Sequence, residues 1–342
     1  MAEKNLCAVL LAAGEGKRMR SNKPKVLCEV LLKPMLGWVI DAARGAGISD
    51  VCVVTGHLEE MVKEYLGDSA TTVTQSERLG TGHAVMMARG FLEEHKGGNV
   101  LVACGDAPFL DTKTISAALK QHVSRGDAVT VISASLEDPT GYGRIIRKED
   151  GSLEHIVEQK DASPEEWDVK EVNSGAYWFN VNALLEVLDT EHITKSEITG
   201  EYYLTETPAA LIKAGYTAGA YEARTPDVVL GANDPKQLYN LGRLARESII
   251  MKHIENGVSI PCTGNVIISP DVKIGSYTQV LPGTILIGKT NIGKCCTIGP
   301  NTVIDGCCVG DGATVNASQI KGCKIAENAV VGPFSCIDQS AK

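Results

Sequence analysis

Two glycines and several cations directly follow the first apolar stretch of the chain, in the segment LLAAGEGKRMRSNKPKVL. Gly14 and Gly16 allow a tight turn and let backbone N–H groups approach phosphate oxygens. Lys17, Arg18 and Lys25 can neutralise the charge of a polyphosphate. This combination after a buried strand predicts a phosphate-binding loop rather than an ordinary surface turn.

The glycine spacing also resembles the dinucleotide-binding pattern GxGxxG. That pattern requires a third glycine at the position of Met19, and no obvious acidic residue for a ribose closes the next apolar run, VCVVTG. The segment therefore favours a nucleotide-binding loop of another type.

A second phosphate-binding pattern, GxxxxGK[ST], is matched in full by GTILIGKT at 283–290. A P-loop needs a buried strand before it and a helix after it. Here the octamer lies among six-residue repeats and is followed by NIGKCCTIGP, which is unsuited to a helix. We predict that this match is not a nucleotide site.

An alternating α/β pattern up to about residue 230 supplies the scaffold for the first loop. Helical spacing at 35–46, 58–66, 83–95 and 112–123 separates the apolar runs CAVLLAA, VCVVTG, NVLVACGD and AVTVISAS. Strands alternating with helices predict parallel pairing and a Rossmann-like, doubly wound α/β fold. Ligands bind such sheets at the carboxyl ends of the strands, where Asp106 ends the third run.

The sequence predicts a linker helix near 234–256, after which the period changes in the second part of the chain. Aliphatic residues recur about every six positions, which predicts a left-handed parallel β-helix of hexapeptide repeats with these side chains inside. They are Ile268, Ile274, Val280, Ile292, Ile298, Ile304, Val309, Val315, Ile325 and Val331. The repeats stop abruptly at the end of the sequence, which predicts either a fragment or an end that a partner subunit covers.

The charge of the chain argues against nucleic acid as a partner. The formal net charge is -9, and a nucleic-acid surface needs many clustered cations. No apolar stretch is long enough for a membrane helix or a signal peptide, so we expect a cytoplasmic protein that binds no membrane.

The cysteines predict neither disulfides nor a zinc site. There are 11 of them, an odd number, and no CxxC pair occurs. Residues of the doublets Cys295-Cys296 and Cys307-Cys308 would point to opposite faces of a strand. We expect free cysteines that serve packing.

Eight segments in a fixed order give the chain a specific resemblance. They are LAAGEGKRM, KPKVL, QSERLGTGHA, CGDAP, DPTGYGRI, IVEQKDA, VNSGAY and GEYYLTE. Together they resemble the uridylyltransferase half of the bacterial bifunctional N-acetylglucosamine-1-phosphate uridylyltransferase/glucosamine-1-phosphate acetyltransferase family. The first segment alone marks the broad nucleotidyltransferase superfamily, whereas the ordered set is diagnostic of this family.

The resemblance implies four groups of site residues. Magnesium would be bound by Asp106 and Asn233, although Asn233 read alone is a helix cap or turn former. The phosphates would meet Lys25 with help from Arg18, and these two with Asp106 form the catalytic set. Uridine contacts would come from Leu11, Ala12, Ala13, Gly14, Gln75, Gly80 and Thr81, and sugar contacts from Gly143, Glu158 and Asn173. Gly105 would also bind the substrate.

Two of these residues have plain structural interpretations as well. Gln75 alone could equally be a buried residue that caps a loop. Glu158 alone would be a solvated strand residue. Cys104, although next to the predicted site, is expected to be a strand residue and not a nucleophile.

The implied reaction joins UTP and N-acetylglucosamine-1-phosphate to form UDP-N-acetylglucosamine, a cell-wall precursor, and pyrophosphate. The implied domains are a nucleotidyltransferase domain at 1–232, a linker helix at 233–256 and a β-helix at 257–342, with trimerisation through the β-helix. Residues for the family's acetyl transfer lie on later coils, so that activity is not expected here. Another nucleotide or sugar phosphate, or a noncatalytic UTP-binding scaffold, stays an alternative.

Overall fold

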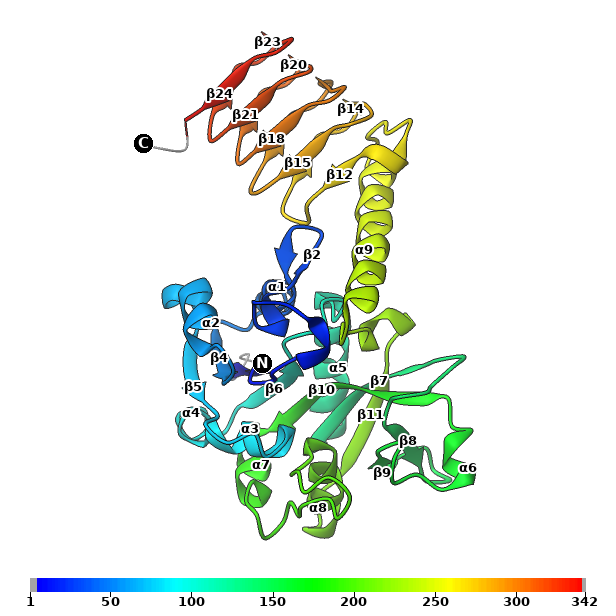
Figure 1. Cartoon of the computed structure of the whole chain (residues 1–342). Helices are drawn as coiled ribbons and strands as arrows, with labels where there is room; N and C mark the ends of the chain where they lie inside the picture. The colour runs from blue at the N-terminus through cyan, green and yellow to red at the C-terminus, as the bar shows by residue number, and fades with distance from the viewer. Residues whose placement is uncertain (1–4, 340–342) are drawn as a thin grey trace. The chain divides into compact units, whose positions relative to one another are not determined.

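The computed structural model describes residues 5–339 (Figure 1). It divides into two compact units, one comprising Met1–Cys28 with Pro34–Gln237 and the other Glu29–Lys33 with Leu238–Lys342. The sequence periodicity did not predict that Glu29–Lys33, which precedes the first helix, belongs to the second unit. The predicted domain boundaries at 232 and 256 stay a prediction. Within the described residues, no helix has both the length and the apolar character that crossing a membrane requires.

The first unit is built on a nine-stranded sheet whose main order is β11-β7-β10-β6-β1-β4-β5. The strands on this path are β1 (Leu6–Leu11), β4 (Asp50–Thr55), β5 (Thr71–Thr74), β6 (Asn99–Cys104), β7 (Val129–Ser135), β10 (Glu171–Asn180) and β11 (Ala218–Glu222). The four apolar runs of the sequence form β1, β4, β6 and β7, and the α/β prediction is confirmed. The strand β10 was not predicted; it lies between β6 and β7 and runs antiparallel to both, so β6 and β7 share one direction without pairing directly.

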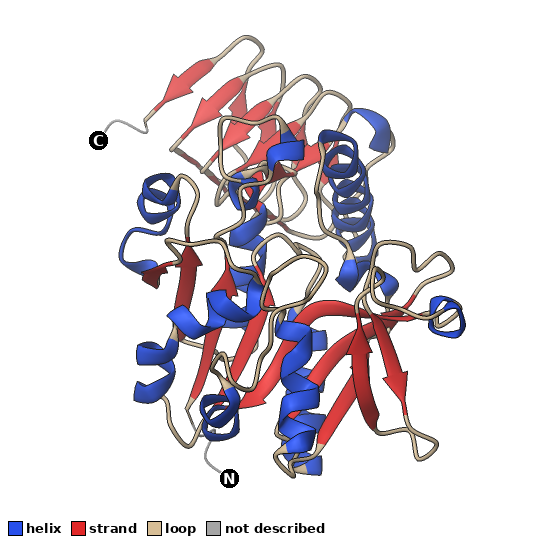
Figure 2. Cartoon of the chain, turned by 60° about the horizontal axis from the view of Figure 1, so that its bottom comes forward, coloured by secondary structure: helices blue, strands red, loops and turns tan. Residues whose placement is uncertain are grey.

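Helices cover both faces of this sheet (Figure 2). On one face pack α1 (Met35–Gly45), α2 (Glu59–Leu66) and α5 (Thr112–Arg125). On the other face pack α3 (Thr81–Met87), α4 (Arg89–Glu94), α7 (Val181–Val187) and α8 (Thr207–Lys213). Alternate residues of each strand point to opposite cores, as Val9 and Leu10 of β1 do. The helix predicted at 83–95 is divided at Ala88.

A hairpin extends the sheet beside β10. It consists of β8 (Arg144–Arg147) and β9 (Leu153–Val157), and Arg144 pairs with Val172 of β10. The short helix α6 (Pro164–Trp167) follows, and its Ser163–Glu166 capping box satisfies backbone donors at its start. The hairpin holds Gly143 just before β8 and Glu158 just after β9.

The second unit contains three parallel sheets in which strands one coil apart pair with each other. The first consists of β12 (Ile267–Ile268), β15 (Ile285–Ile287), β18 (Val303–Asp305), β21 (Gln319–Lys321) and β24 (Cys336–Asp338). The second consists of β13 (Lys273–Ile274), β16 (Asn291–Ile292), β19 (Cys308–Val309) and β22 (Lys324–Ile325). The third consists of β14 (Gln279–Val280), β17 (Thr297–Ile298), β20 (Thr314–Val315) and β23 (Val330–Val331).

Stacked aliphatic side chains fill the interior of this parallel β-helix. Leu286 pairs with Ile304 on the next coil, Ile304 pairs with Ile320, and all three are buried. This matches the predicted hexapeptide architecture, in which neighbouring coils complete each other's core. The octamer 283–290 includes β15 and belongs to these coils, so the rejection of a P-loop is confirmed.

All 11 cysteines are free. In each doublet one cysteine is buried and its neighbour exposed, which confirms their opposite directions. The packing role was wrong for Cys262, Cys295, Cys308 and Cys336, which are exposed. The described part of the chain contains no group of three or more His, Cys, Asp or Glu side chains arranged to hold a metal.

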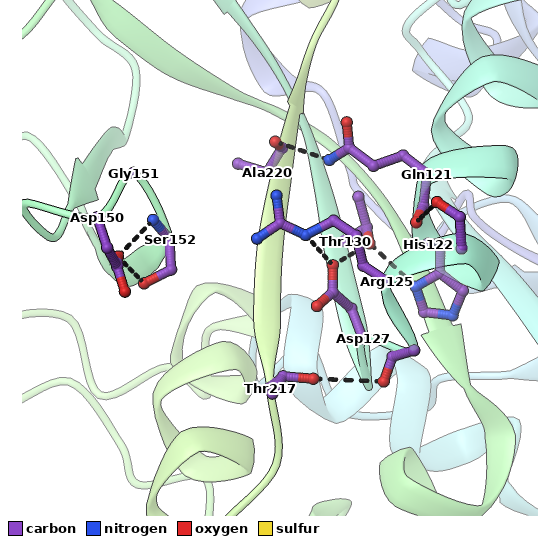
Figure 3. A network of polar contacts seen from close by, with 12 residues as sticks. Gln121, His122, Arg125, Asp127, Thr130, Asp150, Gly151, Ser152, Thr217 and Ala220 are labelled. Atoms are coloured by element: carbon purple, nitrogen blue, oxygen red, sulfur yellow. Dashed lines mark hydrogen bonds and ion pairs between the residues drawn. The ribbon is translucent and has the colours of Figure 1, made fainter.

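A buried polar network joins the end of α5 to the amino-terminal ends of neighbouring strands (Figure 3). The His122 ring contacts the Thr130 hydroxyl at 3.0 Å through Nδ1 and the Asn99 Oδ1 at 3.2 Å through Nε2. Arg125 pairs with the buried Asp127. This edge is opposite the one where ligands bind such sheets, so the network serves folding.

Replacing His122 should remove a pH dependence of stability. Burial lowers the pKa of His122 from 6.5 to about 4, so between these values the unfolded chain binds a proton that the folded chain does not. The contribution is complete above pH 6.5 and is lost as the pH falls towards 4, with about 2 kcal/mol lost by pH 5.

Urea unfolding of the wild type and His122→Asn between pH 7 and 5 measures this effect. The wild type should lose stability relative to His122→Asn as the pH falls, whereas exposed His192→Asn should behave as the wild type. Parallel pH profiles for the wild type and His122→Asn would contradict the buried neutral imidazole.

Candidate active site

The predicted phosphate-binding loop begins where β1 ends. Leu11 ends the strand, and the Ala12 amide donates to the Val54 carbonyl of neighbouring β4 at 2.8 Å. Ala12 and Ala13 are buried, whereas Gly14 is exposed. The loop therefore leaves a fixed sheet edge and reaches solvent at its first glycine.

Gly16 allows this loop to lie against Lys25. Its φ of 61° favours glycine, and a Cβ atom at this position would lie 2.7 Å from the Lys25 Cβ. Two short 3-10 turns, η1 (Lys17–Met19) and η2 (Lys25–Leu27), then carry the predicted cations. Arg18 is exposed on η1, so its phosphate contact stays a prediction.

The Lys25 ammonium group brings together the two predicted metal ligands. It donates to Asn233 Oδ1 at 2.6 Å and forms an ion pair with Asp106. Asp106 follows β6, and the neighbouring Gly105 amide donates to the Leu11 carbonyl at 2.9 Å. The carboxylate and the carboxamide oxygen thus converge on one nitrogen atom.

Asn233 does not act as the helix cap that its position before a helix could indicate. The cap of α9 (Pro235–Glu255) is Asp234, whose Oδ1 accepts from the Gln237 amide at 2.8 Å. The preceding backbone passes close to β6, since a Cβ atom on Gly231 would lie 3.0 Å from the Asp106 carbonyl oxygen. The Asn233 side chain is thereby directed towards Lys25.

These two oxygen ligands fit a magnesium ion that is held together with substrate phosphates. Magnesium prefers oxygen atoms and usually takes only one or two carboxylates from the protein, with water and phosphate completing its shell. Asp106 and Asn233 offer a carboxylate and a carbonyl oxygen on one side of the site. Such a set suits a metal bound with a nucleotide better than a closed protein cage.

Three of the predicted uridine contacts, Gln75, Gly80 and Thr81, lie from the end of β5 to the start of α3. The Gln75 amide donates to the Thr55 carbonyl at 2.8 Å, which anchors the segment at the end of β4. Gly80 has a φ of 106° and its carbonyl oxygen accepts from Gln75 Nε2 at 3.0 Å. Thr81 begins α3, and its hydroxyl accepts from the Leu204 amide at 3.0 Å. Gln75 is buried, and its hydrogen bond to the Gly80 carbonyl closes the loop between them, so its interpretation as a loop cap holds beside any ligand contact.

An ion pair that sequence reasoning missed connects this segment to the phosphate-binding loop. Arg78 pairs with Glu15, and this hydrogen bond holds the pKa of the Glu15 carboxyl below its ordinary value. Both side chains are partly exposed. The sequence offered no signal, because Arg78 is one charged residue in a polar loop.

The three predicted sugar contacts lie together beside β10. The Asn173 amide donates to the Gly143 carbonyl at 2.9 Å, and a Cβ atom on Gly143 would lie 3.6 Å from Glu158 Oε2. Thr205 donates to Glu158 Oε1 at 3.1 Å. Burial raises the pKa of Glu158, so the interpretation as a solvated strand residue was wrong.

Irregular strand pairing directs the Asn173 side chain. The register of β10 against β7 shifts between Asn173 and Ala176, and the Gly175 amide donates to Asn173 Oδ1 at 3.0 Å. Asn173 Nδ2 donates to the hydroxyl of buried Tyr177 at 2.6 Å. Sequence reasoning missed Tyr177, since an apolar strand residue gives no sign of such a role.

Cys104 ends β6 beside these residues. Burial raises the pKa of its thiol to about 12, so the reactive thiolate is disfavoured. The expectation of a strand residue rather than a nucleophile agrees with this environment.

The strand order arranges the predicted nucleotide contacts, Asp106 and the predicted sugar contacts along one sheet edge. Gln75 follows β5 and Gly14 follows β1, Asp106 follows β6 in the centre, and Asn173 lies near the start of antiparallel β10. Because β10 is antiparallel, its amino-terminal end meets the carboxyl ends of the other strands. The predicted uridine and sugar residues therefore flank Asp106 on opposite sides.

Replacing Gly80 by alanine should destabilise the first unit. The new Cβ atom would overlap the Tyr202 carbonyl oxygen and lie 2.9 Å from its nitrogen, and the φ of 106° is unfavourable for alanine. We expect a loss of about 1–3 kcal/mol in the free energy of unfolding. Gly14→Ala is the matched control, since nothing lies within 4 Å of its added methyl group. Equal denaturation midpoints for the two variants would contradict this close approach.

Comparison with known proteins places this architecture among nucleotide-transferring enzymes. The model of the family described as "Nucleotidyl transferase" matches residues 7–226. A structure from Bacillus anthracis, described as a glucose-1-phosphate thymidylyltransferase, has a TM-score of 0.59 and covers 71% of this chain and 96% of its own. Its sequence identity is 21%, so the likeness concerns the fold alone.

More similar relatives match almost the whole chain and are called bifunctional protein GlmU. The relative from Caldanaerobacter subterraneus subsp. tengcongensis is 45% identical over 97% of this chain and 72% of its own length. The relative from a Geobacillus species is 42% identical over 98% of this chain and 72% of its own. That from Clostridioides difficile is 40% identical over 97% of this chain and 71% of its own.

Proposed function

The chain belongs to the GlmU family of nucleotidyltransferases, and we propose that it transfers UMP from UTP to N-acetylglucosamine-1-phosphate. The products are UDP-N-acetylglucosamine and pyrophosphate. The observation that carries the proposal is the convergence of Asp106 and Asn233 on Lys25 at one sheet edge, with the predicted nucleotide contacts on one side and the predicted sugar contacts on the other.

The reaction requires alignment and relief of charge repulsion more than proton transfer. An oxygen of the sugar phosphate attacks the α-phosphorus of UTP, a new P–O bond forms, and the bond to pyrophosphate breaks. A phosphate monoester is already a nucleophile, so no general base is needed. Lys25 and Arg18 would stabilise the developing negative charge, and Asp106 and Asn233 would hold a magnesium ion. Bound magnesium supplies positive charge that orients the phosphates and neutralises the leaving group.

The two flanking groups of residues would hold the reactants for this attack. Gln75, Gly80 and Thr81 would bind the base and ribose, whereas Gly143, Glu158 and Asn173 would bind the sugar. The Glu158 carboxylate can accept from sugar hydroxyls, and Asn173 can donate or accept. Holding both reactants in line supplies much of the rate enhancement, because the attack becomes effectively intramolecular.

Replacing Asp106 tests the proposed centre. We expect Asp106→Asn to lower the rate of pyrophosphate release from UTP and N-acetylglucosamine-1-phosphate at least about 100-fold, because charge stabilisation in the transition state is lost. The assay should also require magnesium. Asp68→Asn is the matched control, since Asp68 is an exposed residue that precedes β5 at the opposite edge of the sheet.

Full activity of Asp106→Asn at ordinary magnesium concentration would contradict the proposal. A panel of nucleotides and sugar phosphates separates it from a related enzyme with other substrates. A wild type that binds UTP without releasing pyrophosphate would instead support the scaffold alternative.

We also propose that the β-helix mediates a homotrimer. Several large side chains of the second unit are exposed, including Tyr277 at 81% and Phe334 at 88%, and such residues suit burial against another subunit. Light scattering should give about three times the mass of one chain, and a monomer mass at micromolar concentration would rule the trimer out. The cytoplasmic location stays a prediction.

A further inference from the structure

The carboxamide group of Gln75 is held by two acceptors on its nitrogen side. Nε2 lies 3.0 Å from the Gly80 carbonyl oxygen and 3.0 Å from Nδ1 of His83. Gln75 is only 5% exposed, so its orientation depends on these protein partners rather than on solvent. His83 was not among the predicted site residues.

The Gly80 carbonyl identifies which end of the carboxamide is the nitrogen. A carbonyl oxygen can only accept, so the atom that faces it must be the amide donor. An amide nitrogen carries two hydrogen atoms, and the second one points to His83. Both donors of Gln75 are therefore used within the described residues, which leaves Oε1 as the atom that can accept from a ligand.

His83 can accept the second amide hydrogen of Gln75 only if Nδ1 is unprotonated, with the ring proton on Nε2. The ring is held in place by stacking on Tyr202, with centroids 6.5 Å apart and planes inclined by 26°. Tyr202 is fixed in turn, because its amide donates to the Leu79 carbonyl at 2.7 Å and its carbonyl accepts from the Gly82 amide at 2.8 Å. The imidazole thus belongs to a rigid support behind Gln75.

We propose that His83 is a positioning residue that determines base selectivity by presenting Gln75 Oε1 to the nucleotide. The inference rests on the proposed function, in which Gln75 contacts the base. An acceptor at this position matches a base whose ring nitrogen N3 carries a hydrogen, as in uracil. Cytosine has an unprotonated N3, which would face Oε1 acceptor to acceptor. The site therefore selects UTP over CTP.

Loss of the His83 acceptor should weaken this selection without removing the binding pocket. In the wild type, turning the carboxamide so that Nε2 faces the base would break two hydrogen bonds, to Gly80 and to His83. Without the His83 acceptor the same rotation breaks only the bond to Gly80. A donor facing the base would favour cytosine and disfavour uracil.

Three forms of the full chain test the inference. His83→Phe keeps an aromatic ring against Tyr202 but removes the acceptor, and His83→Asn offers an oxygen near the position of Nδ1. We expect His83→Phe to lower the UTP to CTP ratio of kcat/KM about 10-fold, the equivalent of one net hydrogen bond. The change should lie mainly in KM, with kcat within about 3-fold of the wild type, and His83→Asn should restore most of the ratio.

Calorimetric titration with UTP and CTP in the absence of the sugar phosphate provides a readout that does not depend on turnover. In His83→Phe the dissociation constant for UTP should rise relative to that for CTP, so that the preference for UTP falls as it does in kcat/KM. Equal losses for both nucleotides, or an unchanged ratio in an active His83→Phe, would overturn the role of His83 and leave the proposed function intact. A wild type that neither binds nor uses UTP would overturn the proposed function and, with it, this inference.

Discussion

The candidate site depends on the placement of one ammonium group among oxygen atoms from distant parts of the chain. Lys25 and Asn233 are 208 residues apart, and Asp106 lies between them in sequence. The side chains of Lys25 and Asp106 are 15% and 23% exposed, so water only partly screens the ion pair. A half-buried carboxylate without a cation would be costly, and the pair therefore stabilises the convergence that a magnesium ion would use.

The sheet provides the second constraint, because it decides which side chains meet at that edge. Parallel strands bring Gly14, Gln75 and Asp106 to their shared carboxyl ends. The antiparallel strand β10 brings Asn173 there from its amino-terminal end, and the β8–β9 hairpin adds Gly143 and Glu158. Reversal of this one strand places the proposed sugar contacts on the opposite side of Asp106 from the proposed nucleotide contacts.

Two histidines of the first unit illustrate how position in the sheet separates stability from function. His122 joins the amino-terminal ends of β6 and β7, where buried polar groups satisfy one another. His83 lies on α3, next to a glutamine that faces the candidate nucleotide site. Both imidazole rings make hydrogen bonds to neighbouring side chains. His83, unlike His122, supports a side chain, Gln75, whose Oε1 can accept from a ligand.

Most elements of the fold and the residue types of the candidate site could be predicted before the structure was known. Apolar runs and helical spacing located β1, β4, β6 and β7 with the helices between them, since burial imposes those periods. The six-residue period likewise determined the β-helix, because each coil must bury the same inward position. The family resemblance named Lys25, Asp106 and Asn233 before any contact between them was visible. No sequence pattern predicted the reversal of β10, the Arg78–Glu15 ion pair or the support of Gln75 by His83, which are visible only in the folded chain. These features arise from pairing between segments far apart in sequence, and a local pattern carries no information about partners that meet only after the chain has folded.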